Sequence, residues 1–487
     1  MADILITHSY LLKFDPKQLR FGQPYAPLGT LYAAAKLREH HPGIAFYDPM
    51  FAEDPSEIDE LIKREKPKIF IIYDDGFNYL TKMCLSNMRE AAFRMIELAR
   101  KQVDHIIVSS SDASDHYPLY FEHGADFCIL GEGEFTLAEL VEKLLNKNSD
   151  TLGEVKGVVR NSPEGIQVNR PRAFLTDLDQ LPFPAWDLLD IENYRSTWLK
   201  KNGYFKMNMV TTRGCPFNCI WCAKPIYGNH YNSRSPENVV KEMLLLKEKF
   251  RPDGLWFADD IFALKPGWID EFARLTKSFN LHLPYTIQTR VDLLLDHRQI
   301  APLAESGCRK AWIGVESGSQ KILDAMKKGT TVEEIYKASP NLREAGIEQA
   351  FFLQLGFPGE TQDDIQKTID LITDLMPEDI GISVTYPLPG TKFYEAVKND
   401  LKSKANWTDS DDLAMLFKSE FTPRYYKILH RYIHKYFRFR QALRMIREVL
   451  SGNQKMTRTH LKRIILLPYY LLFALIFKLF LIQNRGS

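Results

Sequence analysis

Cysteine is scarce in this sequence, with only six in 487 residues. They are too few for the disulfide framework that stabilises small secreted proteins, so the sequence predicts a reducing compartment. The segment MADILITHSY also lacks a basic stretch followed by a long apolar run, and it does not resemble a secretory signal. We therefore expect a cytoplasmic protein. The cysteines are Cys84, Cys128, Cys215, Cys219, Cys222 and Cys308.

Net charge is nearly absent as well. The 63 Lys and Arg residues almost balance the 62 Asp and Glu residues, which argues against nucleic acid as the main partner. Repeats of solenoid length and low-complexity tracts are also missing. The hydrophobic fraction of 45% and the charged fraction of 26% are those of a globular protein with two or three domains.

Residues 1–148 alternate short apolar runs with helix-length amphipathic segments. This alternation predicts a doubly wound, flavodoxin-like α/β domain that binds a ligand beyond the carboxyl ends of its strands. Residues 149–205 are proline-rich and weakly periodic, so we expect a linker packed over a neighbouring domain. The expected strands are 4–7, 44–48, 68–73, 105–111 and 127–134.

The alternation resumes over residues 206–408 with longer helices. Six strand and helix units predict a partial β/α barrel, with chemistry at the carboxyl ends of its strands. The expected strands are 207–212, 254–260, 285–292, 310–317, 349–358 and 379–389.

Three cysteines follow the first barrel strand in the string TTRGCPFNCIWCAK. A structural zinc site is one interpretation, with His230 or Cys308 as a fourth ligand, and unligated cysteines are another. Three thiolates suit a 4Fe-4S cube equally well, because the fourth iron is then left open to a substrate or cofactor.

The CxxxCxxC spacing, the aromatic residue before the last cysteine and the barrel context together resemble the radical S-adenosylmethionine (SAM) superfamily. The resemblance implies that Cys215, Cys219 and Cys222 bind a 4Fe-4S cluster whose open iron chelates SAM. It also implies reductive cleavage of SAM to a 5'-deoxyadenosyl radical that abstracts a hydrogen atom. Trp221 is then expected near the adenine.

Other strand ends match the cosubstrate-binding positions of the same superfamily. Asp259 and Asp260 in FADDIF are candidates for the methionyl amine, because carboxylates accept hydrogen bonds from ammonium groups. Glu316 and Ser317 in GVESGS suit ribose hydroxyls, although a helix cap or a surface charge is the ordinary interpretation of such residues. Two glycines of LQLGFPGET allow close approach to the adenine, and Arg290 pairs either with a carboxylate of the site or with a helix acid. These glycines are Gly356 and Gly359.

The N-terminal domain and the segment DLDQLPFPAWDLL resemble the cobalamin-binding branch of the superfamily. Small residues at the strand ends and in APLGTLYAAAKL are expected to let a flat corrinoid lie against backbone. Two departures weaken this prediction. No DxHxxG string supplies a lower cobalt ligand, and SSSDASDH replaces a GGPH-like turn, so a domain that has lost cobalamin stays an alternative. The small residues are Gly29, Ser109, Ser110, Ser111, Gly131 and Gly133.

Residues 409–487 are expected to form a helical extension. Its first half interleaves basic and aromatic residues, and Glu448 is the only acid between Arg424 and Arg463. Residues 464–482 are almost continuously apolar but are interrupted by Pro468 and Lys478. We expect a monotopic or re-entrant membrane anchor here, against the alternative of a buried terminal helix packed on the barrel.

These features together predict a cobalamin-dependent radical SAM enzyme that modifies an unactivated carbon of a lipophilic substrate. The expected reaction is C-methylation or an oxidative cyclisation like that of anaerobic magnesium-protoporphyrin ester cyclase. A flavodoxin- or ferredoxin-type electron donor and a membrane surface are the expected partners, and nucleic acid is not. Two alternatives are a cobalamin-free radical SAM enzyme and a non-enzymatic tetrapyrrole- or corrinoid-binding membrane protein in which Cys308 closes a structural cluster.

Overall fold

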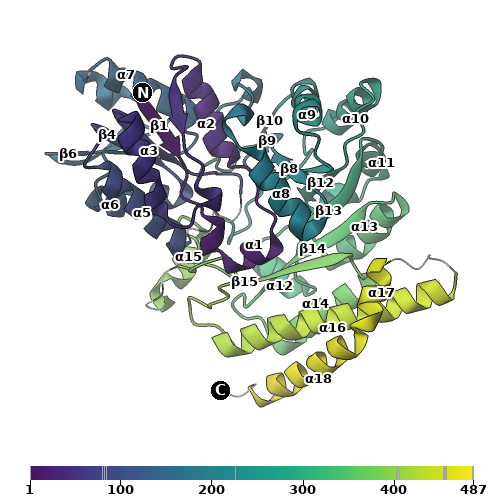
Figure 1. Cartoon of the computed structure of the whole chain (residues 1–487). Coiled ribbons are helices and arrows are strands. Elements are labelled where there is room, and N and C mark those ends of the chain that lie inside the picture. The colour runs from purple at the N-terminus through teal and green to yellow at the C-terminus, as the bar shows by residue number, and fades with distance from the viewer. Residues whose placement is uncertain are drawn as a thin grey trace.

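In the computed structural model, an N-terminal α/β domain lies beside a partial barrel, and a helical hairpin runs beneath the barrel (Figure 1). The structure describes residues 2–78, 81, 83, 85–147, 149–224, 226–401, 404, 406–452 and 458–484. Cys84 lies outside these residues.

The N-terminal sheet contains five parallel strands in the order β2-β1-β3-β4-β5, which is the flavodoxin-like order. Alternate residues of β3 face two different cores, with Ile69 and Ile71 on one side and Phe70 and Ile72 on the other. Burial on both faces explains the continuous apolar runs in the sequence. The strands are β1 (Ile4–Thr7), β2 (Ile44–Phe46), β3 (Ile69–Tyr73), β4 (His105–Ser109) and β5 (Phe127–Ile129). The helices are α2 (Leu28–Arg38), α3 (Ile58–Glu65), α5 (Ser86–Ala99), α6 (Ser111–Glu122) and α7 (Glu134–Leu145).

The segment expected to be a linker contributes to this sheet. Strands β6 (Val158–Ser162) and β7 (Gly165–Val168) form an antiparallel hairpin, and β6 pairs with β5. The expected boundary at residue 148 is therefore wrong, because the sheet continues to residue 168. The rest of the segment packs over the barrel as expected: helix α8 (Ile191–Asn202) lies there, and Trp186 Nε1 donates a hydrogen bond to Glu242 of the barrel at 3.1 Å.

The barrel domain is a six-stranded parallel sheet in sequential order, as predicted. Its strands are β8 (Lys206–Met209), β11 (Gly254–Phe257), β12 (Tyr285–Thr289), β13 (Cys308–Glu316), β14 (Glu348–Leu355) and β15 (Asp379–Val384). The intervening helices are α9 (Pro236–Phe250), α10 (Trp268–Ser278), α11 (His297–Glu305), α12 (Gln320–Ala325), α13 (Val332–Glu344) and α14 (Gln362–Leu375). Two short strands, β9 (Thr212–Arg213) and β10 (Asn232–Ser233), pair beside the end of β8.

Residues 406–417, which we call the strap, connect the barrel back to the N-terminal domain. Ser86 N donates a hydrogen bond to Trp407 O at 2.9 Å, and Ser410 Oγ donates to Asp15 Oδ1 at 2.7 Å. At its other end, the Phe417 ring packs edge-on against Phe393 of α15 (Lys392–Val397) beside the barrel. The strap therefore holds the two domains together from outside their sheets.

The C-terminal extension is helical, as predicted, and consists of α16 (Pro423–Leu450), α17 (Arg458–Ile465) and α18 (Leu467–Gln483). Helix α16 packs on β15 and α14, and α18 lies along α16 (Figure 1). No helix in the described part of the chain is both long and apolar enough to cross a membrane.

Candidate active site

The loop with the three cysteines connects β9 to β10 at the carboxyl end of the first barrel strand. Gly214 opens it with a φ of +77°. A Cβ on Gly214 would lie 2.3 Å from His230 O and 2.9 Å from Tyr227 O, so only glycine fits the start of the loop. Cys215, Cys219 and Cys222 are all partly exposed.

The barrel holds this loop at several points. Ile220 N donates a hydrogen bond to Met326 O at 3.1 Å, and Phe393 N donates to Ile220 O at 3.0 Å. Arg290 follows β12, and its guanidinium stacks 3.7 Å from the centre of the Phe217 ring. Its Nη1 lies 4.0 Å from Cys219 Sγ. The loop is therefore positioned by the carboxyl ends of the barrel strands, as the sequence predicted.

The environment of the thiols favours their protonated form. The pKa of Cys222 is raised to about 12, mainly by burial and also by the charges of Asp260, Cys215 and Cys219. Burial also raises the pKa of Cys215. A cationic metal centre reverses this balance, because a coordinated thiol is deprotonated. The donor set therefore fits an iron centre that supplies the positive charge missing from the loop.

No group of three His, Cys, Asp or Glu side chains in the described ranges lies close enough together to hold one metal ion. A cube of four irons requires each thiol to reach a different iron, so its ligands need not meet at one point. Neither expected fourth ligand completes a group with the three thiols among the described residues. The exposed His230 ring lies against Phe174, and Cys308 begins β13, roughly 26 Å along that strand from its carboxyl end.

The two neighbouring aspartates have different environments. Asp259 is buried and accepts hydrogen bonds from Thr211 N at 2.7 Å, Thr211 Oγ1 at 2.6 Å and Thr212 N at 2.9 Å. Burial raises its pKa to about 6. Asp259 thus stabilises the turn before the cysteine loop, whereas Asp260 is exposed and close enough to Cys215 and Cys222 to raise their pKa values. Of the two, only Asp260 faces the loop.

Glu316, at the end of β13, has a backbone φ of +64°, which is rare outside glycine and is typical of strained functional positions. Its Oε1 accepts a hydrogen bond from Lys328 Nζ at 2.7 Å, and both side chains are buried. The carbonyl of Lys328 accepts a hydrogen bond from Arg290 Nη2 at 2.9 Å. Arg290 also pairs at 2.9 Å with Asp292 in the short helix Val291–Leu294, which is the helix-acid role expected for it. Lys328 was not predicted, because it lies in a loop twelve positions after Glu316 and matches no motif.

Two predicted SAM contacts are occupied by packing instead. The Ser317 hydroxyl lies 3.2 Å from Thr368 Oγ1 on α14 and accepts a hydrogen bond from Ser319 N, so it is not available for a ribose. A Cβ on Gly356 would lie 2.2 Å from Met415 Cε of the strap, and the backbone there approaches the strap closely. Gly359 has no atom within 4 Å of its Cβ position and stays open.

Several of the small residues that were expected to line a cobalamin site serve packing or helix capping instead. Ser110 caps α6, because its Oγ accepts a hydrogen bond from Ala113 N at 2.8 Å. Gly29 and Gly133 allow close packing. A Cβ on Gly29 would lie 3.0 Å from Asp75 Cα, and a Cβ on Gly133 would lie 2.7 Å from Tyr73 Oη. Ser109 is also buried, with its Oγ 3.1 Å from the Gly133 Cβ position.

Three groups at the same sheet edge stay available to a ligand. The buried Ser111 Oγ and His116 Nε2 have no hydrogen-bond partner among the described residues. Gly131 has a φ of +74°, and the nearest atom to its Cβ position is Ile226 O of the barrel, 3.8 Å away. A ligand at this sheet edge would therefore meet the backbone of Gly131 beside the backbone of Ile226.

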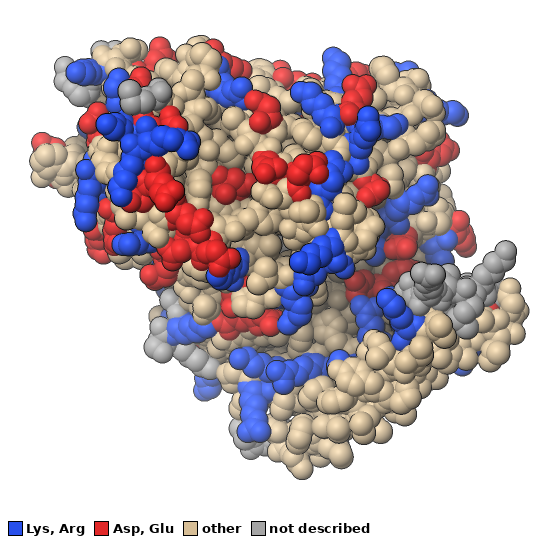
Figure 2. Space-filling model, in the orientation of Figure 1, with Lys and Arg blue, Asp and Glu red and all other residues tan. Residues whose placement is uncertain are grey.

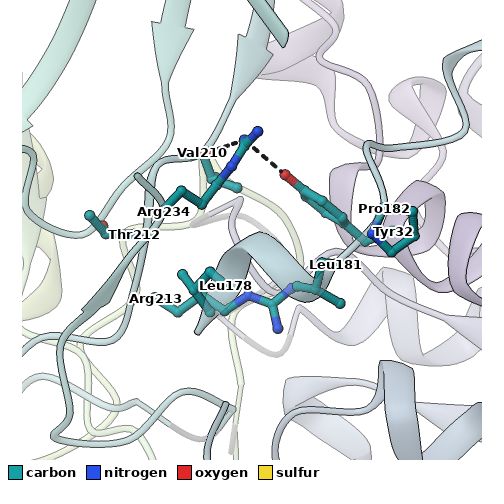
Figure 3. Close-up of a pocket in the computed structure, with 8 residues that line it drawn as sticks. All are labelled: Tyr32, Leu178, Leu181, Pro182, Val210, Thr212, Arg213 and Arg234. Carbon is teal, nitrogen blue, oxygen red and sulfur yellow. Dashed lines mark hydrogen bonds between the residues drawn. The ribbon is translucent and has the colours of Figure 1, made fainter. Parts of the chain in front are cut away.

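Arg213 connects the two domains directly before the cysteine loop. Its Nη1 and Nη2 donate hydrogen bonds to the two carboxylate oxygens of Glu134, at 3.1 and 2.6 Å, and Glu132 lies 3.7 Å away. All three side chains are buried. Figure 3 shows Arg213 and Arg234 lining a small pocket with Tyr32, Leu178, Leu181 and Pro182. The sequence analysis missed this ion pair, because the spacing of Glu134 and Arg213 gives no sign of their contact.

Comparison with known proteins agrees with this geometry. Residues 209–372 match the family model described as the radical SAM superfamily. An uncharacterised methyltransferase of Pyrococcus horikoshii is 28% identical over 78% of this chain and 80% of its own length. An anaerobic magnesium-protoporphyrin IX monomethyl ester cyclase of Rubrivivax gelatinosus is 26% identical over 55% of this chain and 48% of its own.

A solved structure of OxsB, a cobalamin-dependent S-adenosylmethionine radical enzyme with aqua-cobalamin bound, superposes with a TM-score of 0.75 at 17% identity. The superposition covers 98% of this chain and 72% of that one. The non-enzymatic alternative is therefore wrong, and the position of Cys308 agrees with this. The chain is an enzyme with a radical SAM domain over residues 209–372, and its fold resembles that of a cobalamin-dependent S-adenosylmethionine radical enzyme.

Proposed function

We propose that the protein uses SAM and cobalamin to modify an unactivated carbon atom of a lipophilic substrate. The observation that carries this proposal is the cysteine loop, which the barrel holds against the carboxyl edge of the N-terminal sheet through Arg213 and Glu134. A radical enzyme with a second cofactor needs these two edges to face one another.

Cys215, Cys219 and Cys222 would hold the 4Fe-4S cluster. When bound, the cluster supplies the electron that cleaves SAM. Asp260 is the candidate for the methionyl ammonium group, because its charge acts on Cys215 and Cys222. Trp221 offers a buried Nε1 that has no acceptor among the described residues, and an adenine nitrogen would satisfy it. Arg290 and Lys328 would orient the loop and Glu316 through their observed contacts.

Ser111, His116 and Gly131 would line the cobalamin site. When bound, cobalamin supplies a methyl group or a second redox centre. C-methylation is the preferred reaction, because an uncharacterised methyltransferase matches most of this chain. Oxidative cyclisation is the second candidate, and the match to the magnesium-protoporphyrin ester cyclase supports it. A flavodoxin- or ferredoxin-type protein is the proposed electron donor. The lipophilic substrate is proposed because α18 exposes an apolar surface on the same molecule.

Cluster assembly tests the first half of this proposal. Anaerobic reconstitution should give about four irons per chain and cleavage of SAM to 5'-deoxyadenosine. Cys219→Ala should lose both properties, whereas Cys308→Ala should keep both, because Cys308 lies at the opposite end of the barrel. Loss of the cluster in Cys308→Ala would overturn the assignment.

Corrinoid uptake tests the second half. Gly131→Trp should abolish cobalamin uptake by placing a bulky ring on this backbone edge, while SAM cleavage continues. The matched control is Gly165→Trp in the turn of the β6–β7 hairpin, where φ is also positive and no atom lies within 4 Å. If wild-type protein takes up no cobalamin under reducing conditions, the cobalamin-free alternative holds.

A further inference from the structure

Helix α18 carries apolar side chains on both of its faces. Tyr470, Phe473, Ala474, Phe477 and Leu481 recur every three or four residues and form the less exposed face. The opposite stripe is exposed to solvent, and we call it the apolar ridge. It consists of Leu472 at 56%, Leu475 at 52%, Leu479 at 61% and Ile482 at 51% of their full accessibility.

A ridge of this kind is unusual on a surface in contact with water. The outer face of a packed helix in a soluble domain is normally polar, and a helix that is apolar all round is normally buried or in lipid. Pro468, Leu466 and Ile465 extend the exposed surface to the start of α18 and the end of α17. An apolar patch of this length marks a docking surface.

The charges beside the ridge have one sign. Helix α16 carries eight Lys and Arg residues and one acid, Glu448, which pairs with Arg444. Arg424, Lys427, Arg431 and Lys435 recur every three or four residues, so they share one side of α16. We call them the basic stripe.

The basic stripe borders α18. Lys435 Nζ donates a hydrogen bond to Tyr469 Oη at 2.9 Å and lies 4.4 Å from the centre of that ring. Figure 2 shows the tan surface of the hairpin with blue groups along its edge. Among the described residues, no carboxylate lies within 4.0 Å of Arg424, Lys427 or Arg431.

We propose that α16 and α18 dock this enzyme on an anionic lipid surface, with the apolar ridge among the acyl chains and the basic stripe at the phosphates. An apolar strip beside unpaired cations is complementary to such a surface, and tyrosines such as Tyr469 favour the boundary between headgroups and acyl chains. A second copy of the chain fits less well, because a two-fold contact through the ridge would oppose two basic stripes. This inference does not depend on the proposed chemistry.

Vesicle sedimentation with full-length protein tests the docking surface. Wild-type protein should bind vesicles of phosphatidylcholine and phosphatidylglycerol, and should bind pure phosphatidylcholine at least about tenfold more weakly. Leu472→Glu/Leu475→Glu/Leu479→Glu should abolish binding. The matched control is Ile166→Glu/Val168→Glu/Phe279→Glu, three equally exposed residues away from the hairpin, and it should bind as wild type.

The basic stripe has its own test. Lys427→Gln/Arg431→Gln should weaken binding about twenty-five-fold, since each cation at an anionic surface contributes about fivefold. Lys241→Gln/Lys249→Gln on α9 is the control with the same charge change and should have no effect. Equal binding to neutral and anionic vesicles overturns the proposal. So does a wild-type protein that ignores vesicles and forms dimers that Leu475→Glu dissociates, because the ridge is then an interface between copies.

Discussion

At the scale of single residues, the buried pair of Glu316 and Lys328 is the most consequential contact that the sequence did not predict. Lys328→Met leaves the Glu316 carboxylate buried without a partner. We expect the free energy of unfolding to fall by about 3–5 kcal/mol. Urea denaturation measures this loss. Lys327→Met changes the exposed neighbour of Lys328. Its free energy of unfolding should fall by less than about 0.5 kcal/mol. Equal losses in the two variants would contradict the importance of the pair.

Glu360 should make stability depend on pH. Burial raises its pKa from 4.5 to about 8. The folded state therefore holds this proton more tightly than the unfolded state, so the stabilisation is complete below about pH 4.5 and is lost as the pH rises through 8. Glu360→Gln keeps an acceptor for Gly356 N. It should reduce the fall of the unfolding free energy with rising pH by up to about 1.4 kcal/mol per pH unit. Unfolding midpoints at pH 5, 6, 7 and 8 provide the comparison, with exposed Asp363→Asn as the unchanged control.

The sequence predicted which strand ends carry polar residues but not which residue faces the site. Asp259 and Asp260 are adjacent and chemically identical, and only the path of the chain after β11 turns one inward and the other toward the thiols. Ser317 and Ser110 have the composition of binding residues but serve packing and capping. Such assignments depend on side-chain direction, which one sequence does not specify.

At the scale of elements, the cysteine loop depends on the backbone of Gly214. Gly214→Ala combines an unfavourable positive φ with a clash against His230 O, so we expect the loop to shift and iron incorporation to fall at least about tenfold. Gly267→Ala shares a positive φ, but no atom lies within 4 Å of its Cβ position. The Gly267→Ala variant should lose only about 1 kcal/mol in its free energy of unfolding and should keep its iron. Iron and sulfide analysis after reconstitution distinguishes the two variants.

The strands of both domains were predictable because parallel strands buried on both faces are continuous apolar runs. The β6–β7 hairpin was not, since β7 (GIQV) is largely exposed and follows a two-residue turn of Pro163 and Glu164. The hairpin needs no apolar run, because β5 supplies its hydrogen-bonding edge. Strand pairing of this kind depends on the sheet beside it and leaves little trace in local sequence.

At the scale of the whole molecule, the ion pair between Arg213 and Glu134 should couple the two domains. Arg213→Met and Glu134→Gln should each lower the free energy of unfolding by about 3–5 kcal/mol. Their combination should cost clearly less than the sum, which a double-mutant cycle measures. Arg38→Met removes the exposed pair with Asp187 and should cost at most about 1 kcal/mol. Strict additivity of the Arg213 and Glu134 losses would show that the pair does not couple the domains.

The strap has a consequence for synthesis on the ribosome. Its Ser410 bonds to Asp15, 395 positions earlier in the chain. A ribosome that adds about 5–20 residues per second reaches Ser410 roughly 20–80 s after Asp15. During that interval the N-terminal domain is complete but lacks the segment that hydrogen-bonds to its Asp15 and Ser86. The nascent chain is therefore expected to need a chaperone for most of its translation, and slowing elongation near the 3' end of the message should lower its soluble yield.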